Sequence, residues 1–376
     1  MARLAVAGLS VRALAESARA GGFTVVGLDA FGDRDTRAAC VAWRRIGDAL
    51  RIEPVAFQAA LHELAPDVIG WVPGGGFEDD PALLEAGGDA LPCFGLGPEI
   101  VRRVRDPRRF FAALDAHGIG HPETVFAPPA DPRGWLAKRA GGCGGTHVEP
   151  APGAGAADAY WQRLQPGDAM SALFLADGER AGVVGLNRQF VQALGPLPYV
   201  YAGAVGPVAA APAVRAAVDA ALAALVPEFG LRGLCSLDFL VDGDAVAVLE
   251  LNPRPSATMQ LYPDVCPGGL VRAHLQALTD PLPVLAEPRL VRGHRVVFAN
   301  APRDVDDALS HALAGLGAHD VPVPGTRIGA GEPVCSVSAA AGSVASAQAR
   351  LAERVDAVEA LLAAGTGLRP VLVLES

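Results

Sequence analysis

Strands and helices alternate along the first 100 residues, and this alternation constrains the fold more than any other feature. Apolar runs predict strands at residues 3–7, 23–28, 67–72 and 93–96. Between them, the spacing of apolar residues predicts helices at 10–20 and 57–64, the first capped by Ser10. Repeated strand–helix–strand units form parallel sheets with helices on both faces. We therefore predict an α/β fold that begins with a doubly wound N-terminal domain over residues 1–100.

The rest of the chain indicates two further parts, in keeping with a length of 376 residues. Residues 101–286 hold a helix capped by Asp106, then predicted strands, a helix and a β-hairpin at 160–164, 170–175, 182–186, 212–225 and 234–251. Residues 287–376 form a C-terminal α+β segment, with strands at 295–300 and 334–337 and helices at 305–316 and 344–362.

Composition excludes several classes of protein. The formal net charge of -10 argues against a broad nucleic-acid surface. The longest uncharged stretch, 189–214, carries four prolines, so we expect no membrane span. The six cysteines have no metal-site spacing and are predicted to be reduced and mostly structural, which makes the cytoplasm the expected compartment.

Lys138 is the only lysine in the chain, and it lies three residues before the glycine-rich run 141–145. Glycines let backbone N–H groups converge on phosphate oxygens, and an ammonium group adds a cation for the same charge. The lysine precedes the glycines, so the run is not a Walker A loop. Residues 134–156 are either a linker or a mobile loop with a function, and the alternative to phosphate binding is a flexible surface linker with an incidental lysine.

Three oxygen-bearing side chains converge on the predicted hairpin 234–251. Glu250 and Asn252 are two residues apart and so share one face of a strand, and Asp238 lies on the partner strand. Carboxylate and amide oxygens suit Mg²⁺, with nucleotide phosphates completing the coordination. The alternative is a solvated strand end in which Arg254 alone balances the carboxylates.

The segment 160–164 is a third candidate. Its backbone has the donors and acceptors to bind an adenine edge, and Asp168 lies where it would meet ribose hydroxyls, although an ordinary hairpin strand explains the same residues. The histidines His121, His147 and His274 have no partner spacing and receive no catalytic role.

In this order, the segments RVRDPRRFFAALDAHGIGHPET, the Lys138 loop, YWQRLQPGDAMSAL and SLDFLVDGDAVAVLELNPRPS resemble the ATP-grasp superfamily of ligases. The three-part layout is similar to biotin carboxylase, to the ATPase subunit of phosphoribosylaminoimidazole carboxylase, and above all to predicted carboligases grouped beside them. The resemblance implies an ATP-grasp fold, with a central grasp domain at 101–286 whose lid covers about 125–176.

The resemblance also implies roles for individual residues. The phosphates of ATP would be covered by Lys138 and the loop glycines Gly142, Gly144 and Gly145. Adenine would be held by Gln162, Arg163 and Leu164, and the ribose would be approached by Asp168. Two Mg²⁺ ions, with Mn²⁺ as an alternative, would be held by Asp238, Glu250 and Asn252, and Arg254 would face the reacting groups. Where the family often has Asp-Lys this chain has Asp106-Pro107, and Arg108 is the suggested substitute for that lysine.

The function expected from the resemblance is an ATP- and Mg²⁺-dependent carboxylate–amine ligase that acts on small molecules, with cofactor biosynthesis as a setting. A substrate carboxylate would take the γ-phosphoryl group to give an acyl phosphate, which an amine then attacks. Two alternatives stay open, a bicarbonate-activating carboxylase component and a non-catalytic ATP-sensing subunit.

The family association suggests a homodimer. Candidate walls of the substrate cleft are Arg188, Gln189 and Tyr201.

Overall fold

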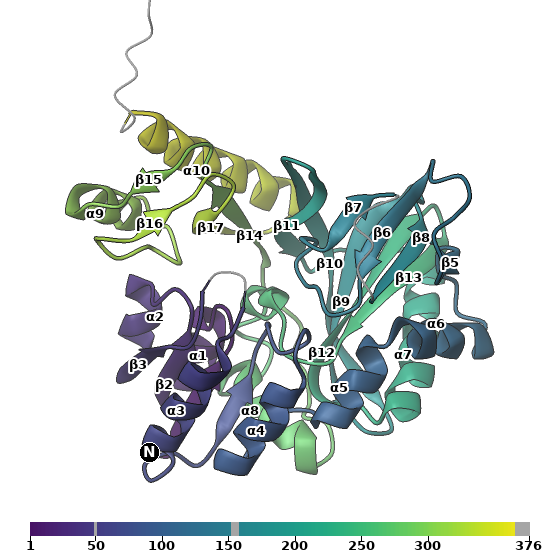
Figure 1. The fold of residues 1–376 in the computed structure, drawn as a ribbon, viewed down its shortest axis with the longest axis horizontal. Helices are drawn as coiled ribbons and strands as arrows, with labels where there is room; N and C mark the ends of the chain where they lie inside the picture. The colour runs from purple at the N-terminus through teal and green to yellow at the C-terminus, as the bar shows by residue number, and fades with distance from the viewer. Residues whose placement is uncertain (49–50, 152–157, 365–376) are drawn as a thin grey trace, which may run out of the picture.

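A computed structural model describes residues 1–48, 51–151 and 158–364. Its described strands form an N-terminal parallel sheet, a long antiparallel sheet, a small antiparallel sheet and one two-stranded pair (Figure 1). The predicted α/β architecture with a parallel N-terminal sheet is confirmed.

The N-terminal sheet has the strand order β3-β2-β1-β4, and every pair in it is parallel. Its strands and the helices around them are β1 (Arg3–Ala7), α1 (Arg12–Ala20), β2 (Thr24–Asp29), α2 (Arg34–Ala39), β3 (Ala42–Arg45), α3 (Pro54–Leu64), β4 (Trp71–Pro73) and α4 (Ala82–Ala90). Alternate residues of β1 enter two different cores, Leu4 and Val6 with α1, and Ala5 and Ala7 with α3. Both faces of the sheet are therefore covered, as a doubly wound unit requires.

Two details of the sequence prediction are wrong here. Helix α1 begins at Arg12 with Val11 as its N-cap and no side-chain capping bond, so Ser10 is not the cap. Residues 93–96 form only a single bridge, from Cys93 to Trp71. Pro92 and Gly95 interrupt this run, so the chain does not form a further strand beside β4. It continues into α5 (Pro98–Arg105).

The long sheet has seven strands in the order β13-β12-β9-β10-β11-β14-β17, all antiparallel. The strands are β9 (Asp168–Asp177), β10 (Ala181–Leu194), β11 (Leu197–Gly206), β12 (Arg232–Asp242), β13 (Ala245–Asn252), β14 (Val291–Phe298) and β17 (Pro333–Ala341). Because β14 and β17 come from the C-terminal segment, one continuous sheet joins the central and C-terminal parts. The associated helices are α7 (Pro212–Phe229), η1 (Ala257–Leu261), α8 (Gly269–Thr279) and α10 (Val344–Ala364).

The small sheet has the order β5-β8-β6-β7, with β5 (Thr124–Val125), β6 (Trp135–Arg139), β7 (Val148–Pro150) and β8 (Ala159–Arg163). Strands β6 and β7 lie inside the range 134–156, so its interpretation as a flexible surface linker is wrong for these residues. Trp135, Ala137 and Trp161 form a small core that keeps this region ordered despite its glycines. Residues 152–157 of that range lie outside the described part of the chain.

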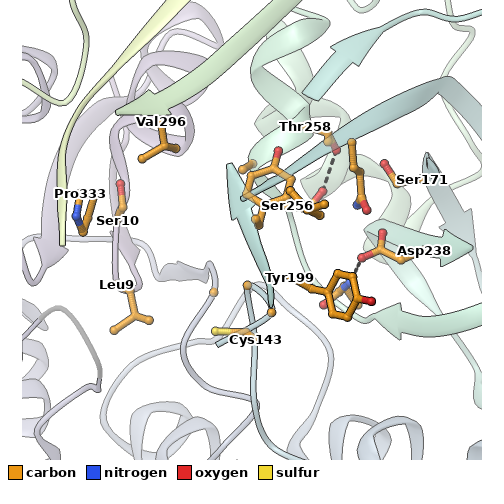
Figure 2. Close-up of a pocket in the computed structure, with 18 of the residues that line it drawn as sticks. Leu9, Ser10, Cys143, Ser171, Tyr199, Asp238, Ser256, Thr258, Val296 and Pro333 are labelled. Atoms are coloured by element: carbon orange, nitrogen blue, oxygen red, sulfur yellow. Dashed lines mark hydrogen bonds between the residues drawn. The ribbon is translucent and has the colours of Figure 1, made fainter. Parts of the chain in front are cut away.

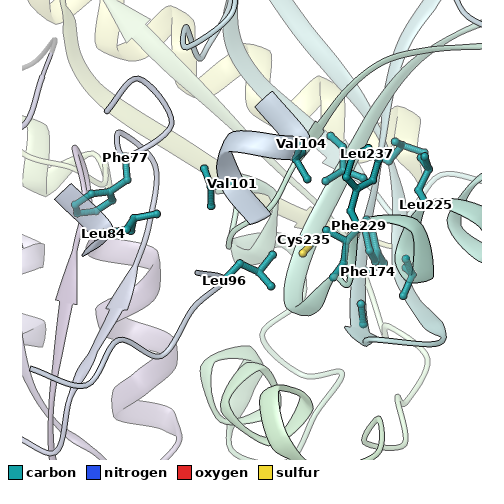
Figure 3. Packing of buried hydrophobic residues seen from close by; sticks show 14 of the residues in the cluster. Phe77, Leu84, Leu96, Val101, Val104, Phe174, Leu225, Phe229, Cys235 and Leu237 are labelled. Carbon is teal, nitrogen blue, oxygen red and sulfur yellow. The ribbon is translucent and has the colours of Figure 1, made fainter. Parts of the chain in front are cut away.

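One hydrophobic core connects the N-terminal sheet with the long sheet (Figure 3). It runs from Phe77 and Leu84, through Val101 and Val104 of α5, to Phe174, Phe229 and Leu237. Helix α6 (Pro107–Ala116) follows α5, and the Asp106 side chain caps it by accepting from the Arg108 and Arg109 amides. The cap predicted at Asp106 is confirmed.

The C-terminal segment adds the pair β15 (Arg303–Asp304) and β16 (Arg327–Ile328) and the helix α9 (Asp307–Gly315). All six cysteines are free thiols. Within the described ranges, no helix combines the length and the apolar character needed to cross a lipid bilayer.

Candidate active site

A cleft of about 940 Å³ opens where the three parts of the chain meet (Figure 2). Leu9 and Ser10 come from the turn between β1 and α1, Asp238 from the long sheet, and Val296 and Pro333 from its C-terminal strands. Of the residues predicted to bind ATP, Mg²⁺ or the reacting groups, all line this cleft except Gly142 and the suggested lysine substitute Arg108. Of the three predicted substrate walls, Gln189 and Tyr201 line it and Arg188 does not. The volume lies near the upper end of ~300–1,000 Å³ for drug-sized ligands, which leaves room for a nucleotide beside a small substrate.

Two carboxylates face each other at the floor of the cleft. Asp238 on β12 and Glu250 on β13 are direct partners in the antiparallel register. Burial and the neighbouring charge of Glu250 raise the pKa of Asp238. Burial also disfavours the charged form of Glu250, but the nearby cations Arg105 and Lys138 outweigh it and lower the pKa of that residue. Two acids this close are a natural place for a divalent cation.

Asn252 completes the cluster, but its amide is oriented for hydrogen bonding. Its Nδ2 donates to Asp238 Oδ2 and to Glu250 Oε1, both at 3.3 Å, while its Oδ1 accepts from Arg254 at 3.3 Å. To bind a cation through oxygen, the amide must rotate and give up the bond from Arg254. The donor set therefore fits Mg²⁺ through the two carboxylates, and through Asn252 only after this rotation.

Arg105, the last residue of α5, connects the carboxylates to the glycine-rich loop. It donates to Glu250 Oε2 at 3.4 Å and to the carbonyl oxygens of Ala140 and Gly142 at 2.9 and 2.6 Å. Arg108, the suggested substitute for the family's lysine, instead lies over the Phe126 ring at 4.4 Å and does not line the cleft. The cation that reaches this loop is Arg105, one helix earlier.

Lys138 lies on β6 and enters the same cleft. Its Nζ donates a 2.6 Å hydrogen bond to Oε1 of Gln162 on β8. Burial lowers the pKa of Lys138 to about 8, although Glu250 and Asp238 favour its charged form. Among the described residues no carboxylate forms an ion pair with this buried ammonium, which is therefore suited to an anionic ligand.

The glycine-rich loop is folded against strand β11. The Gly144 carbonyl accepts from the Tyr201 amide at 2.9 Å, and both Gly144 and Gly145 have positive φ, +63° and +75°. A Cβ on Gly145 would lie 1.9 Å from the Tyr199 carbonyl oxygen, and one on Gly142 would lie 2.1 Å from the His147 Cβ. Glycine is required at these positions by close packing, which brings the loop backbone to the cleft.

Arg254 is held by an acid from the N-terminal part. Its Nε donates to Oε1 of the buried Glu78, whose Oε2 accepts from the Gly76 amide at 2.7 Å. Burial opposes the charge of Glu78, but Arg254 and Arg105 outweigh it and hold the pKa of Glu78 below its ordinary value. The pair fixes a guanidinium at the junction of two parts of the chain.

The residues predicted for adenine and ribose lie along one wall of the cleft. The backbone amides of Arg163 and Leu164 already donate to the carbonyls of Glu123 and Gly134. The Gln162 side chain is buried between Lys138 and Thr124, and the Arg163 guanidinium stacks on Trp135 at 4.3 Å. Asp168 accepts from Arg188 at 3.2 Å. Their roles in nucleotide binding stay predictions, with Gln165 as a further cleft residue beyond the strand end.

Two residues predicted to form walls of the substrate cleft, Gln189 and Tyr201, form hydrogen bonds at the site. Gln189 forms a hydrogen bond with Asp238, and Tyr201 with His294 at 2.8 Å. His147, which received no role, is buried in the cleft wall, and its Nδ1 has no hydrogen-bond partner in the described part of the chain. Burial lowers the pKa of His147 to about 4, so this ring is neutral at physiological pH.

Sequence reasoning missed Glu78, Arg105 and His147 because each reaches the site from a different segment. One signal was available for Glu78, which follows the glycine turn 74–76 after a predicted strand, where doubly wound folds bind ligands. Arg105 and His147 had no comparable pattern.

The architecture defines the class of this chain, which has the ATP-grasp fold. Residues 104–258 match the family described as the ATP-grasp domain. No curated protein matches the sequence.

Solved structures extend the likeness over nearly the whole chain. Biotin carboxylase from Campylobacter jejuni has a TM-score of 0.72 at 14% identity, covering 96% of this chain and 94% of that one. N5-carboxyaminoimidazole synthase from Aspergillus clavatus, in complex with ADP and 5-aminoimidazole ribonucleotide, has a TM-score of 0.69 at 15% identity, covering 96% and 99%. L-amino acid ligase from Bacillus licheniformis has a TM-score of 0.68 at 12% identity, covering 95% and 97%. At these identities the likeness establishes the ATP-grasp fold alone.

Proposed function

We propose that this protein is an ATP- and Mg²⁺-dependent ligase that joins a small carboxylate to an amine through an acyl phosphate. The observation that carries the proposal is the convergence of Lys138, the carboxylates Asp238 and Glu250, and the guanidinium of Arg254 on one cleft. Cations beside paired acids suit the transfer of a phosphoryl group between anions. The similar solved structures include ligases that form C–N bonds, which supports this reaction class.

In the proposed first step, a substrate carboxylate oxygen attacks the γ-phosphorus of ATP while the bond to the bridging oxygen breaks and ADP leaves. Lys138 and the backbone of the glycine-rich loop would hold the phosphates. Asp238 and Glu250 would hold Mg²⁺, with Mn²⁺ as an alternative, and the ion would neutralise charge on the transferred group. Arg254 would orient the carboxylate, since Glu78 fixes its position.

In the second step, an amine nitrogen attacks the acyl carbon, the C–O bond to phosphate breaks, and the nitrogen loses a proton. The acyl phosphate is open to hydrolysis, so water must be excluded while it waits. We propose that residues 125–176 are the lid that does so. In support, the loop 141–145 is hydrogen-bonded to β11 and to Arg105, which also donates to Glu250 at the cleft floor. We place the reaction in the cytoplasm, and a homodimer remains a prediction.

A panel of carboxylates and amines tests the proposal by measuring ADP release with each component omitted in turn. A ligase requires both organic substrates. A bicarbonate-activating carboxylase component, the alternative suggested by the likeness to biotin carboxylase, would release ADP with bicarbonate and no amine. A non-catalytic ATP-sensing subunit would bind ATP and release no ADP in any mixture.

A further inference from the structure

Asp33 is a buried acid that lines the cleft from the N-terminal part, and its side chain forms no hydrogen bond or ion pair with any described residue. It lies between β2 and α2, and 5% of the residue is exposed. It precedes the first residue of α2 but does not cap that helix. An Asp at this position ordinarily accepts from the first turn, so its oxygens are directed elsewhere.

The neighbouring acids, in contrast, are all satisfied. Asp29 accepts from the Trp43 ring at 2.6 Å and from the Gly32 amide at 2.9 Å. Asp35 accepts from the backbone amides of Asp320 and Val321 at 2.7 and 3.1 Å. Among these three acids, Asp33 is therefore the exception.

The nearest buried cation is already used. The Arg12 guanidinium pairs with Asp320 at 2.7 Å, with Glu16 at 3.1 Å and with Asp35 at 3.4 Å, and it also donates to Gln260. One guanidinium thus serves three carboxylates, and this end of the cleft carries an excess of negative charge. Burial, together with the charges of Asp320, Asp29 and Asp35, raises the pKa of Asp33 to about 8. A cation bound beside Asp33 would balance the charge of this buried carboxylate.

The surroundings indicate which kind of cation fits. A divalent metal ion needs several ligands, and the side chains here whose ligand atoms lie together, Glu16, Asp35 and His319, do not include Asp33. The lining of the same cleft also includes apolar side chains from the N-terminal and C-terminal parts, Leu9, Val296 and Pro333 (Figure 2). A carboxylate in a cleft with both polar and apolar lining suits an ammonium group attached to a hydrocarbon body.

We infer that Asp33 binds a non-reacting primary ammonium group carried by one of the two organic substrates, whose hydrocarbon body spans the apolar part of the cleft. The inference rests on the proposed ligase function and makes it more specific. Asp33 would be a specificity residue, remote in sequence from the phosphate and metal residues but lining the same cleft.

Binding by the full chain tests the inference without turnover. Isothermal titration compares ω-aminoalkanoates with the matching alkanoates, and diaminoalkanes with the matching diols. We expect the ammonium-bearing probe to bind about tenfold more tightly in at least one pair, and Asp33→Asn to abolish the preference. The matched control is Asp67→Asn, which removes the same charge from an exposed ion pair with Arg3 and should keep the preference.

A chain that shows no preference for the ammonium probes overturns the inference, as does an Asp33→Asn variant that keeps the preference. If Asp33→Asn does not fold, Asp33→Glu keeps the charge and is expected to keep the preference, and its loss of selectivity would count against the inference.

ADP release then separates the two substrates and the two proposals. Turnover favoured by aminoalkanoates assigns the ammonium to the carboxylate substrate, and turnover favoured by diamines over monoamines assigns it to the amine substrate. Equal turnover with and without the extra ammonium contradicts the inference and leaves the ligase intact. Ammonium binding at Asp33 without any ADP release contradicts the ligase proposal and leaves the ammonium site intact.

Discussion

The Nζ of Lys138 lies 2.6 Å from Oε1 of Gln162, and this hydrogen bond holds the only lysine of the chain between two strands of the small sheet. The glutamine oxygen fixes the ammonium without neutralising it. A phosphate would therefore meet a buried positive charge that has no tight carboxylate partner.

This arrangement predicts that ATP binding takes up protons near pH 8. Phosphate charge should raise the pKa of Lys138 from about 8 toward its ordinary value, so about half a proton is taken up at that pH. Titration calorimetry in buffers of different ionisation enthalpy measures this uptake. Lys138→Arg stays charged throughout and should show no uptake and weaker ATP binding. Equal uptake and equal affinity in the variant would show that Lys138 is not a phosphate contact.

Gly145 and Gly144 provide a matched pair for the glycine-rich loop. Both have positive φ, so alanine costs about 1–2 kcal/mol of backbone strain at either position. Only at Gly145 does the new Cβ also collide with the Tyr199 carbonyl, whereas at Gly144 it meets open space. We expect Gly145→Ala to weaken ATP binding by at least tenfold more than Gly144→Ala, measured by calorimetry. Equal effects of the two variants would mean that the packing of the loop on β11 does not matter for binding.

The carboxylate pair predicts a stability response to Mg²⁺. At an ion concentration of 100 times the dissociation constant, binding to the folded state adds about 2.7 kcal/mol to the free energy of unfolding. Asp238→Asn should lose this gain and should raise the stability of the metal-free protein, since it removes the repulsion from Glu250. Asp244→Asn, at the exposed turn of the same hairpin, is the control. Denaturant unfolding with and without Mg²⁺ measures this increase in the free energy of unfolding. An equal increase in Asp238→Asn and in the unsubstituted protein would argue against a metal ion at this pair.

The Glu78–Arg254 pair predicts strong coupling between the N-terminal part and the site. Glu78→Gln leaves the guanidinium without its counter-charge and should lower the free energy of unfolding by roughly 3 kcal/mol. The double variant Glu78→Gln/Arg254→Gln should recover part of this loss, because no unpaired charge remains. Denaturant unfolding of the two single variants and the double variant measures the coupling. Additive effects of the two substitutions would contradict an energetic link between them.

Much of the fold was predictable because its signals are local. Alternating strands and helices gave the parallel N-terminal sheet, and Asp238, Glu250 and Asn252 were placed together by hairpin register and strand periodicity alone. The union of β14 and β17 with the central strands was not predictable, since it depends on pairing between segments almost a hundred residues apart.

The missed site residues have the same explanation. Arg105 ends a helix whose charged residues look like a solvated face, and only tertiary packing brings it to Glu250. Asp33 lies in the short loop between β2 and α2, close in sequence to Asp29 and Asp35, and nothing in the sequence distinguishes it from Asp35. Its lack of a partner is visible only when the neighbours are in place.

The most direct test of the account is ADP release by the full chain with ATP, Mg²⁺ and a panel of carboxylates and amines. The account predicts ADP formation that requires one carboxylate and one amine together and falls at least about a hundredfold in Asp238→Asn. Bound ATP with no ADP formed in any mixture, or ADP formation that is unaffected by this substitution, would contradict it.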